Sequence, residues 1–228
     1  TREALVEYEY LPRNRIDVIY NGITPLKVDR GKQQALREEL GLQPDETVIG
    51  TVARLDAVKN QAMMIRATRS LRDQNHNVKL LLVGDGPERD VLKALAADLE
   101  LKASVIFTGF QSQPAEYLSL MDIFLLPSFT EGTSMTLLEA MSLGIPTVAT
   151  RVGGTPEIVA DGETGILTES DNLSEFTSAL KLLLEQPATR EQMADRAKQR
   201  FSERFSVAQM VQKYQKLYET PRCLADKK

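Results

Sequence analysis

The most constraining feature of this 228-residue sequence is a regular alternation of short apolar runs and longer amphipathic segments. The runs are rich in Val, Ile, Leu and Phe with little polar alternation, which is typical of strands buried on both faces of a parallel sheet. The predicted strands cover residues 16–20, 47–53, 78–84, 104–109, 122–127 and 146–150. The predicted helices between them cover about 32–40, 60–74, 87–100, 114–121, 134–143 and 155–160. This order predicts an α/β fold, an open parallel sheet with helices on both faces.

The last quarter of the chain has a different pattern, which favours helices alone. Three consecutive helices are expected there, with Asp171 and Ser206 as N-caps and Pro187 between the first two. We expect residues 1–220 to form a single domain and the polar residues 221–228 to form a frayed tail.

Charge and composition limit the classes of function. A net charge of −4 and a pI of about 5.3 argue against a general nucleic-acid binder. Cys223 is the single cysteine, so no disulfide framework can form within the chain, which fits a reducing compartment. No apolar run reaches the length of a membrane span, so we expect no integral membrane segment. His76 is the single histidine, which argues against a histidine-based metal site.

Glycine-rich or charged clusters follow five of the predicted strands. The carboxyl ends of parallel strands lie along one edge of a sheet, and ligands bind at that edge in open α/β folds. The clusters are "RLDAVKN" after Ala53, "GDGPE" after Val83, "GFQ" after Thr108, "SFTEGTS" after Pro127 and "RVGG" after Thr150. The sequence therefore predicts a binding site along this edge.

Arg54 and Lys59 form a basic pair within the first of these clusters. Arg54 directly follows a predicted buried strand, and Lys59 lies at a predicted helix start. Lysine is mildly unfavourable beside the positive end of a helix dipole, whereas a basic pair at such a place suits a phosphate. The alternative is ordinary surface charge.

The loop "GDGPE" invites comparison with the dinucleotide-binding fingerprint. That fingerprint needs a third glycine where Arg89 stands, so the match fails. Pro87 suits the first turn of a helix. Two interpretations remain open: a plain strand-to-helix turn, or a loop on which a planar group lies against main chain.

Two glutamates in "EGTSMTLLEAMSLGIP" suggest the two ends of an elongated ligand. Thr133 or Ser134 can cap the helix, which leaves Glu131 in the loop and Glu139 about five residues inside, roughly 7–8 Å along the axis. That separation exceeds the ~5 Å of the carboxyl pair in retaining glycosidases. Phosphates can lie over the helix start, with a polyhydroxylated group near each glutamate. The alternative is an exposed Glu131 and a buried Glu139 that has hydrogen-bond partners within the protein.

An ordered set of motifs resembles one domain of a known enzyme family. The motifs are "YNGI", "ARLDAVKN", "LLVGDGP", "FTGF", "EGTSMTLLEAMSLGIPTVAT" and "GGTPEIV", from about residue 16 to residue 218. Together they resemble the C-terminal, nucleotide-sugar-binding domain of GT-B fold glycosyltransferases of family 4, also called glycosyl transferases group 1. The resemblance implies a Rossmann-like domain with C-terminal helices that forms one half of a GT-B architecture.

The resemblance also implies roles for individual residues. Arg54 and Lys59 would bind the donor diphosphate and stabilise the leaving nucleotide. Glu131 would contact the transferred sugar as a third catalytic residue, and Glu139 would accept hydrogen bonds from the ribose. The remaining donor-binding residues would be Gly84, Asp85, Gly86, Gly109 and Phe110 around the base, main-chain groups of Thr136, Leu137 and Leu138 at the phosphates, and Gly132.

The family's activity is retaining hexosyl transfer without a metal or other cofactor. The donor would be a UDP- or GDP-sugar, and the acceptor a glycan or glycolipid in polysaccharide or lipopolysaccharide synthesis. A cytoplasmic location follows, either free or peripheral at the inner face of the membrane. Two positions depart from the family pattern: Thr24 stands where Asp is frequent, and Thr133-Ser134 where Phe-Gly is frequent. Ser134 has a Cβ that would change which donor sugar fits.

GT-B enzymes place their site between two domains, and this chain supplies one of them. We expect residues 1–15 to be the exit from a missing N-terminal domain that binds the acceptor, and the chain alone to bind donor weakly and transfer little. Transfer by the isolated chain at ordinary enzyme rates would contradict this expectation. Two alternatives are a non-catalytic nucleotide-sugar-binding module and a nucleotide-sugar epimerase on the same architecture. An epimerase needs acid/base groups, for which His76 in the polar turn "DQNHN" is a poor candidate.

Overall fold

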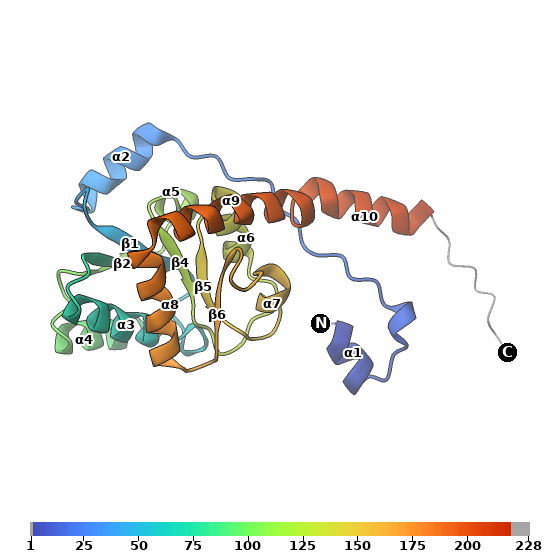
Figure 1. The fold of residues 1–228 in the computed structure, drawn as a ribbon, viewed down its shortest axis with the longest axis horizontal. Helices are drawn as coiled ribbons and strands as arrows, with labels where there is room; N and C mark the ends of the chain where they lie inside the picture. The colour runs from blue at the N-terminus through green and yellow to red at the C-terminus, as the bar shows by residue number, and fades with distance from the viewer. Residues whose placement is uncertain (1, 220–228) are drawn as a thin grey trace.

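Six parallel strands form the centre of the molecule in the order β3-β2-β1-β4-β5-β6, as the ribbon in Figure 1 shows. The computed structural model describes residues 2–219, so Cys223 and the predicted frayed tail at 221–228 lie outside the described residues. The strands are β1 (Thr47–Val52), β2 (Val78–Val83), β3 (Val105–Gly109), β4 (Ile123–Leu126), β5 (Thr147–Thr150) and β6 (Gly165–Thr168). This is the doubly wound order of a Rossmann-like sheet, with its switch point between β1 and β4.

Helices cover both faces of the sheet, which confirms the predicted fold class (Figure 1). One face carries α3 (Gln61–Asp73), α4 (Arg89–Asp98) and α8 (Leu173–Glu185). The other face carries α2 (Arg30–Glu39), α5 (Pro114–Leu118), α6 (Met135–Leu143) and α9 (Pro187–Arg204). Neighbouring residues of β2 show why both faces are apolar: Leu80 packs in one core cluster and Leu81 in the other, because side chains alternate along a strand.

The remaining elements lie around this core. They are α1 (Arg2–Tyr8), α7 (Thr155–Ile158), α10 (Val207–Glu219) and the 3₁₀ helices η1 (Arg13–Arg15) and η2 (Ala57–Lys59). Figure 1 shows α10 continuing from the end of α9 away from the sheet.

One predicted strand is absent from the structure, and one strand of the structure was not predicted. Residues 16–20 form no strand; they belong to an extended segment outside the sheet, where the ring of Tyr20 packs edge-on against Phe205 with centroids 5.5 Å apart. A few residues later, Ile23 N–H donates to the Phe205 carbonyl at 3.0 Å. Tyr20 at the end of this segment covers the junction of α9 and α10, whereas Asp17 and Val18 are exposed. Conversely, β6 was missed because its four residues lie between two polar stretches, 161–164 and 169–172.

The C-terminal helices match the prediction except at one cap. Pro187 is the first residue of α9, and Ser206 Oγ accepts from Gln209 N–H at 3.4 Å, as an N-cap does. Asp171 is not a cap: it has a left-handed φ of 58°, and the side chain of Asn172 accepts from Glu175 N–H instead.

Candidate functional site at the carboxyl edge of the sheet

Main-chain hydrogen bonds join the loops at the carboxyl edge of the sheet. Leu55 N–H donates to the Asp85 carbonyl at 3.0 Å, which ties the loop after β1 to the loop after β2. Phe129 N–H donates to the Val58 carbonyl at 2.9 Å, which ties the loop after β4 to that after β1. The predicted clusters therefore lie together on one edge.

Two glycines permit the close approach of these loops. Gly84 has φ +135°, and a Cβ there would lie 2.0 Å from the Ala53 carbonyl oxygen. Gly153 has φ +51°, and a Cβ there would lie 1.8 Å from the Glu131 carbonyl oxygen. The next residue, Gly154, donates its N–H to that same oxygen at 3.1 Å. Any side chain at Gly84 or Gly153 would push two loops apart.

The loop after β4 leads into α6, whose first turn faces this edge. Ser134 is the N-cap: its Oγ accepts from Leu137 N–H, and its carbonyl accepts from Leu138 N–H, both at 3.3 Å. Within residues 2–219, the N–H of Thr136 makes no hydrogen bond. Of the three main-chain groups expected to hold phosphate, that of Thr136 is thus the one available to a ligand at the positive end of the helix.

Lys59 and Glu131, far apart in the sequence, form an ion pair. Lys59 ends η2, and its Nζ lies 2.5 Å from Glu131 Oε1. The Glu131 side chain is 7% exposed and the Lys59 side chain 27% exposed. Ser128 Oγ donates to the same Glu131 oxygen at 2.7 Å. The positive charge of Lys59 is therefore held in one place and partly offset.

Arg54 projects from the same loop but is far more accessible. Its side chain is 71% exposed, and its Nε lies 3.8 Å from Asp56 Oδ2. The buried side chain of Gln61 donates to the Arg54 carbonyl at 2.8 Å and fixes the main chain there. Arg54 can therefore turn its guanidinium toward an anion at this edge.

A cavity of about 440 Å³, the β1–β3 cavity, opens at the carboxyl ends of the first three strands. Five predicted donor-binding residues line it: Arg54, Gly84, Asp85, Phe110 and Thr136. The Phe110 side chain is 80% exposed, so its ring is free to contact a ligand. The other lining residues are Val52, Ala53, Val83, Gln111 and Pro114.

Gly86 and Gly109 shape the loops beside this cavity and do not line it. The Gly109 carbonyl accepts from Gly84 N–H at 2.9 Å. Asp85 Oδ1 accepts from Gly86 N–H at 2.8 Å, and its Oδ2 lies 3.1 Å from Arg89 Nη1. Both oxygens of the Asp85 carboxylate therefore already have partners nearby in the sequence.

A second cavity of about 370 Å³, the Tyr20 cavity, lies next to Glu131. Burial raises the pKa of the Tyr20 hydroxyl above its ordinary value, and the neighbouring Glu157 carboxylate raises it further. Tyr20 therefore stays protonated and can donate a hydrogen bond. The lining residues are Tyr20, Glu131, Gly132, Thr133, Gly153, Gly154, Glu157 and Ile158.

Glu139 lies within α6, among apolar neighbours. Burial raises the pKa of its carboxyl above the ordinary glutamate value. Ser142 Oγ donates to the main-chain oxygen of Glu139 at 2.8 Å, but in the described part of the chain no group donates to its carboxylate. A half-buried carboxylate without donors can accept hydrogen bonds from a ligand's hydroxyl groups.

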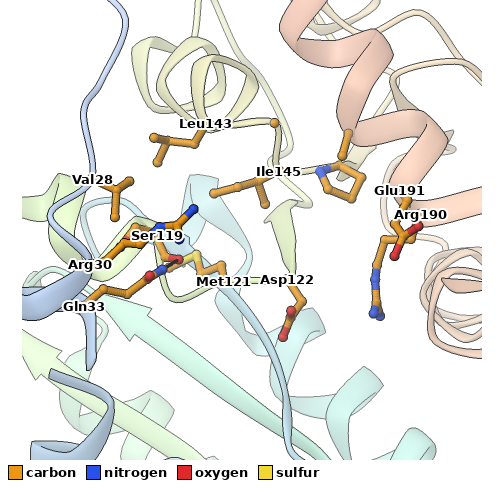
Figure 2. A pocket seen from close by; sticks show the side chains of 13 residues that line it. Val28, Arg30, Gln33, Ser119, Met121, Asp122, Leu143, Ile145, Arg190 and Glu191 are labelled. Carbon is orange, nitrogen blue, oxygen red and sulfur yellow. Dashed lines mark hydrogen bonds between the residues drawn. The ribbon is translucent and has the colours of Figure 1, made fainter. Parts of the chain in front are cut away.

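A third cavity of about 470 Å³, the amino-edge cavity, lies at the opposite edge of the sheet. Figure 2 shows Arg30 on one side of it and Arg190 and Glu191 on the other. Asp122 also lines it and accepts from Val48 N–H at 2.8 Å. Charges of both signs line this cavity, with Arg30 and Arg190 opposed by Asp122 and Glu191.

Residues 2–219 contain neither a cluster of metal-ligating side chains nor a helix that could span a membrane. No group of three or more His, Cys, Asp or Glu side chains in that range is arranged to hold a metal ion. None of the helices there combines the length and apolar character needed to cross a membrane.

Sequence reasoning missed the contributions of Ser128, Tyr20 and Glu157. Ser128 could have been found, because it follows a predicted strand and precedes Glu131 by three residues. Tyr20 could not, because its segment was expected to lie within the sheet. Glu157 was expected to be part of a helix, without any sign that it would face Tyr20.

Comparison with known proteins gives consistent matches over most of the chain. The family model for glycosyl transferases group 1 matches residues 32–200. N-acetyl-alpha-D-glucosaminyl L-malate synthase of Bacillus anthracis is 33% identical over 208 residues, which are 91% of this chain and 54% of that protein. D-inositol 3-phosphate glycosyltransferase of Rhodococcus opacus is 33% identical over 214 residues, 90% of this chain and 48% of that protein. The chain spans about half the length of these relatives.

A solved structure shares both the fold and part of the sequence. The Anabaena protein HepE, crystallised in complex with UDP, superposes with a TM-score of 0.87 at 27% identity. The match covers 96% of this chain and 61% of that one.

Proposed function

This chain belongs to the glycosyl transferases group 1 family, and on that premise we propose that it binds the nucleoside diphosphate sugar donor of a glycosyltransferase. The proposal rests on one observation: Arg54, Lys59 and the start of α6 lie together on one edge of the sheet, between two cavities. That HepE was crystallised in complex with UDP supports the binding of a nucleotide by this chain.

The nucleoside would occupy the β1–β3 cavity. The exposed ring of Phe110 offers a face on which a base can stack. Glu139 would accept hydrogen bonds from the ribose hydroxyls, which would give its carboxylate the donors that it lacks. UDP and GDP both fit this description.

The diphosphate would lie over the start of α6. The free N–H of Thr136 and the helix dipole favour negative charge there, and Arg54 can reach it from the solvent side. Lys59 would supply a directed hydrogen bond, because Glu131 holds its ammonium in place. Charge stabilisation by these groups would help the nucleotide leave, which is work that a divalent cation can do elsewhere.

The transferred sugar would lie beside Glu131 and Gly132, toward the Tyr20 cavity. We propose a hexose, transferred with retention to a glycan or glycolipid that the rest of a longer protein would bind. Glu131 would then have two roles, one toward Lys59 and one toward the sugar.

Calorimetric titration with UDP and GDP tests this assignment. Lys59→Ala and Glu139→Ala should each weaken binding of the preferred nucleotide by about tenfold or more, the loss expected for a hydrogen bond to a charged group. Lys32→Ala is the matched control: this lysine pairs with Glu116 at 3.0 Å on the exposed surface and should leave affinity unchanged. If neither nucleotide binds, or if Lys59→Ala behaves like Lys32→Ala, the proposed function is wrong.

A further inference from the structure

Ser128 holds a fully buried position two residues after the end of β4, next to the Lys59–Glu131 pair. Its side chain is 0% exposed, and its Oγ donates to Glu131 Oε1 at 2.7 Å. Its carbonyl accepts from the buried hydroxyl of Thr150, at the end of β5, at 2.5 Å. A chain of hydrogen bonds thus runs from the sheet to the ion pair.

Both donors to Glu131 use the same oxygen. Lys59 Nζ and Ser128 Oγ meet at Oε1, whereas Oε2 makes no hydrogen bond within residues 2–219. A carboxylate has about four acceptor sites, so Oε2 can still accept from a ligand. The two donors on Oε1 fix the rotation of the carboxylate and thereby determine where Oε2 lies.

The main chain around these groups is also tied together. Phe129 N–H donates to the Val58 carbonyl, next to Lys59, and Gly154 N–H donates to the Glu131 carbonyl. The loops are thus fixed by main-chain bonds, which leaves the side chains of Lys59 and Glu131 as the parts that can move. Without Ser128, that side chain would have one anchor, the flexible Lys59.

We propose that Ser128 is a positioning residue for the donor: it holds Glu131 so that Oε1 aims Lys59 at the diphosphate and Oε2 faces a hydroxyl of the donor sugar. This inference rests on the proposed function. It differs from a structural role, in which Ser128 would only satisfy buried polar groups, because it requires Ser128 to act through Glu131.

A double-mutant cycle on the 228-residue chain separates the two roles. The probe is whichever of UDP and GDP binds the unaltered chain more tightly, and the readout is its Kd by calorimetry. Ser128→Ala should weaken binding by roughly three- to tenfold, part of the worth of a hydrogen bond to a charged group. In a Glu131→Ala background the same change should alter Kd by less than about twofold, because contacting residues are non-additive.

Two further variants make the cycle decisive. Ser128→Cys is nearly isosteric and keeps a weak donor, so it should fold and show an intermediate Kd. Ser104→Ala removes a buried serine hydroxyl at the far edge of the sheet and should leave Kd unchanged.

Each result has one meaning. An unchanged Kd for Ser128→Ala, or the same fold-loss with and without Glu131, overturns the positioning role. If Lys59→Ala weakens binding while Ser128→Ala does not, this inference fails alone and the proposed function stands. If the unaltered chain binds neither nucleotide, the proposed function fails and the role of Ser128 with it.

Discussion

Glu139 makes the stability of the folded chain depend on pH in a direction unusual for a carboxylate. Burial raises the pKa of its carboxyl, so the folded chain holds this proton more tightly than the unfolded chain. Its contribution to stability is complete below the ordinary glutamate pKa and is lost as the pH rises through the raised pKa. The glutamate is therefore retained at a cost to stability at neutral pH, which fits a ligand-binding role.

Replacement of Glu139 by glutamine should remove this pH dependence. Glutamine cannot ionise, so Glu139→Gln should have a higher free energy of unfolding than the unaltered chain at pH 7, and the difference should vanish at acidic pH. Urea unfolding between about pH 4 and pH 8 measures it, across the ordinary glutamate pKa. If the unaltered chain is the more stable at pH 7, the account of Glu139 is wrong.

Asp161 supplies a control of opposite sign. Burial raises the pKa of its carboxyl, but the Leu167 N–H at 2.9 Å and the Arg151 guanidinium together hold the pKa below the ordinary aspartate value. The stabilisation that ionised Asp161 gives the folded chain is present above the unfolded-state pKa, and it is lost as the pH falls through the lowered folded-state pKa. Asp161→Asn should cost about 1 kcal/mol at pH 7, given the solvent exposure of the pair, and less at acidic pH.

At the residue scale, the sequence predicts which charged residues lie at the carboxyl edge, but it does not predict which of them contact one another. Arg54, Lys59 and Glu131 could be placed on one edge because each follows a predicted strand. The Lys59–Glu131 pair could not be foreseen, since 72 residues separate its members. The convergence of Lys59 and Ser128 on one oxygen of Glu131 could not be foreseen either, because the rotamers of these side chains depend on how both loops pack.

At the scale of elements, close loop packing depends on Gly84. Its φ of +135° and the 2.0 Å approach of a Cβ to the Ala53 carbonyl oxygen exclude a side chain. Gly84→Ala should cost about 2 kcal/mol or more, because strain and a steric clash add. It should also weaken nucleotide binding, since Gly84 lines the β1–β3 cavity.

Gly41→Ala is the matched control for that change. Gly41 has a φ of +67°, but no atom lies within 4 Å of where a Cβ would stand. Backbone strain alone should then cost about 1 kcal/mol, without any effect on binding. Denaturant unfolding of both variants measures the difference, and equal losses would show that loop contact at Gly84 contributes nothing.

Five of the six strands were predictable from apolar runs, and the exceptions have a physical cause. Residues Val78–Val83 read as a strand because both faces are buried, between β1 and β3. Residues 16–20 are also largely apolar, but they lie outside the sheet, and Tyr20 packs on Phe205 between α9 and α10. An apolar run in the sequence predicts that its residues pack in the core, but it does not identify the element against which they pack. Gly165–Thr168 was missed because polar stretches flank it on both sides.

At the scale of the whole molecule, the parallel strand order brings the site together. All carboxyl ends share one edge, so loops spread over more than 100 residues meet there. Arg54 and Lys59 lie at this edge, each beside a carboxylate, in a chain whose net charge is −4. The chain spans about half of its relatives' length, so we propose that acceptor binding belongs to other residues of a longer protein.

The most direct test is to locate the residues of this chain that a nucleotide contacts. A ¹H–¹⁵N NMR titration of the chain with UDP and GDP reports this residue by residue. We expect saturable shifts of the Gly84, Phe110 and Thr136 amides, with Ser119 and Arg190 at the amino-edge cavity unaffected. Shifts gathered at the amino-edge cavity, or no shifts at all, would contradict a nucleotide-sugar site at the carboxyl edge.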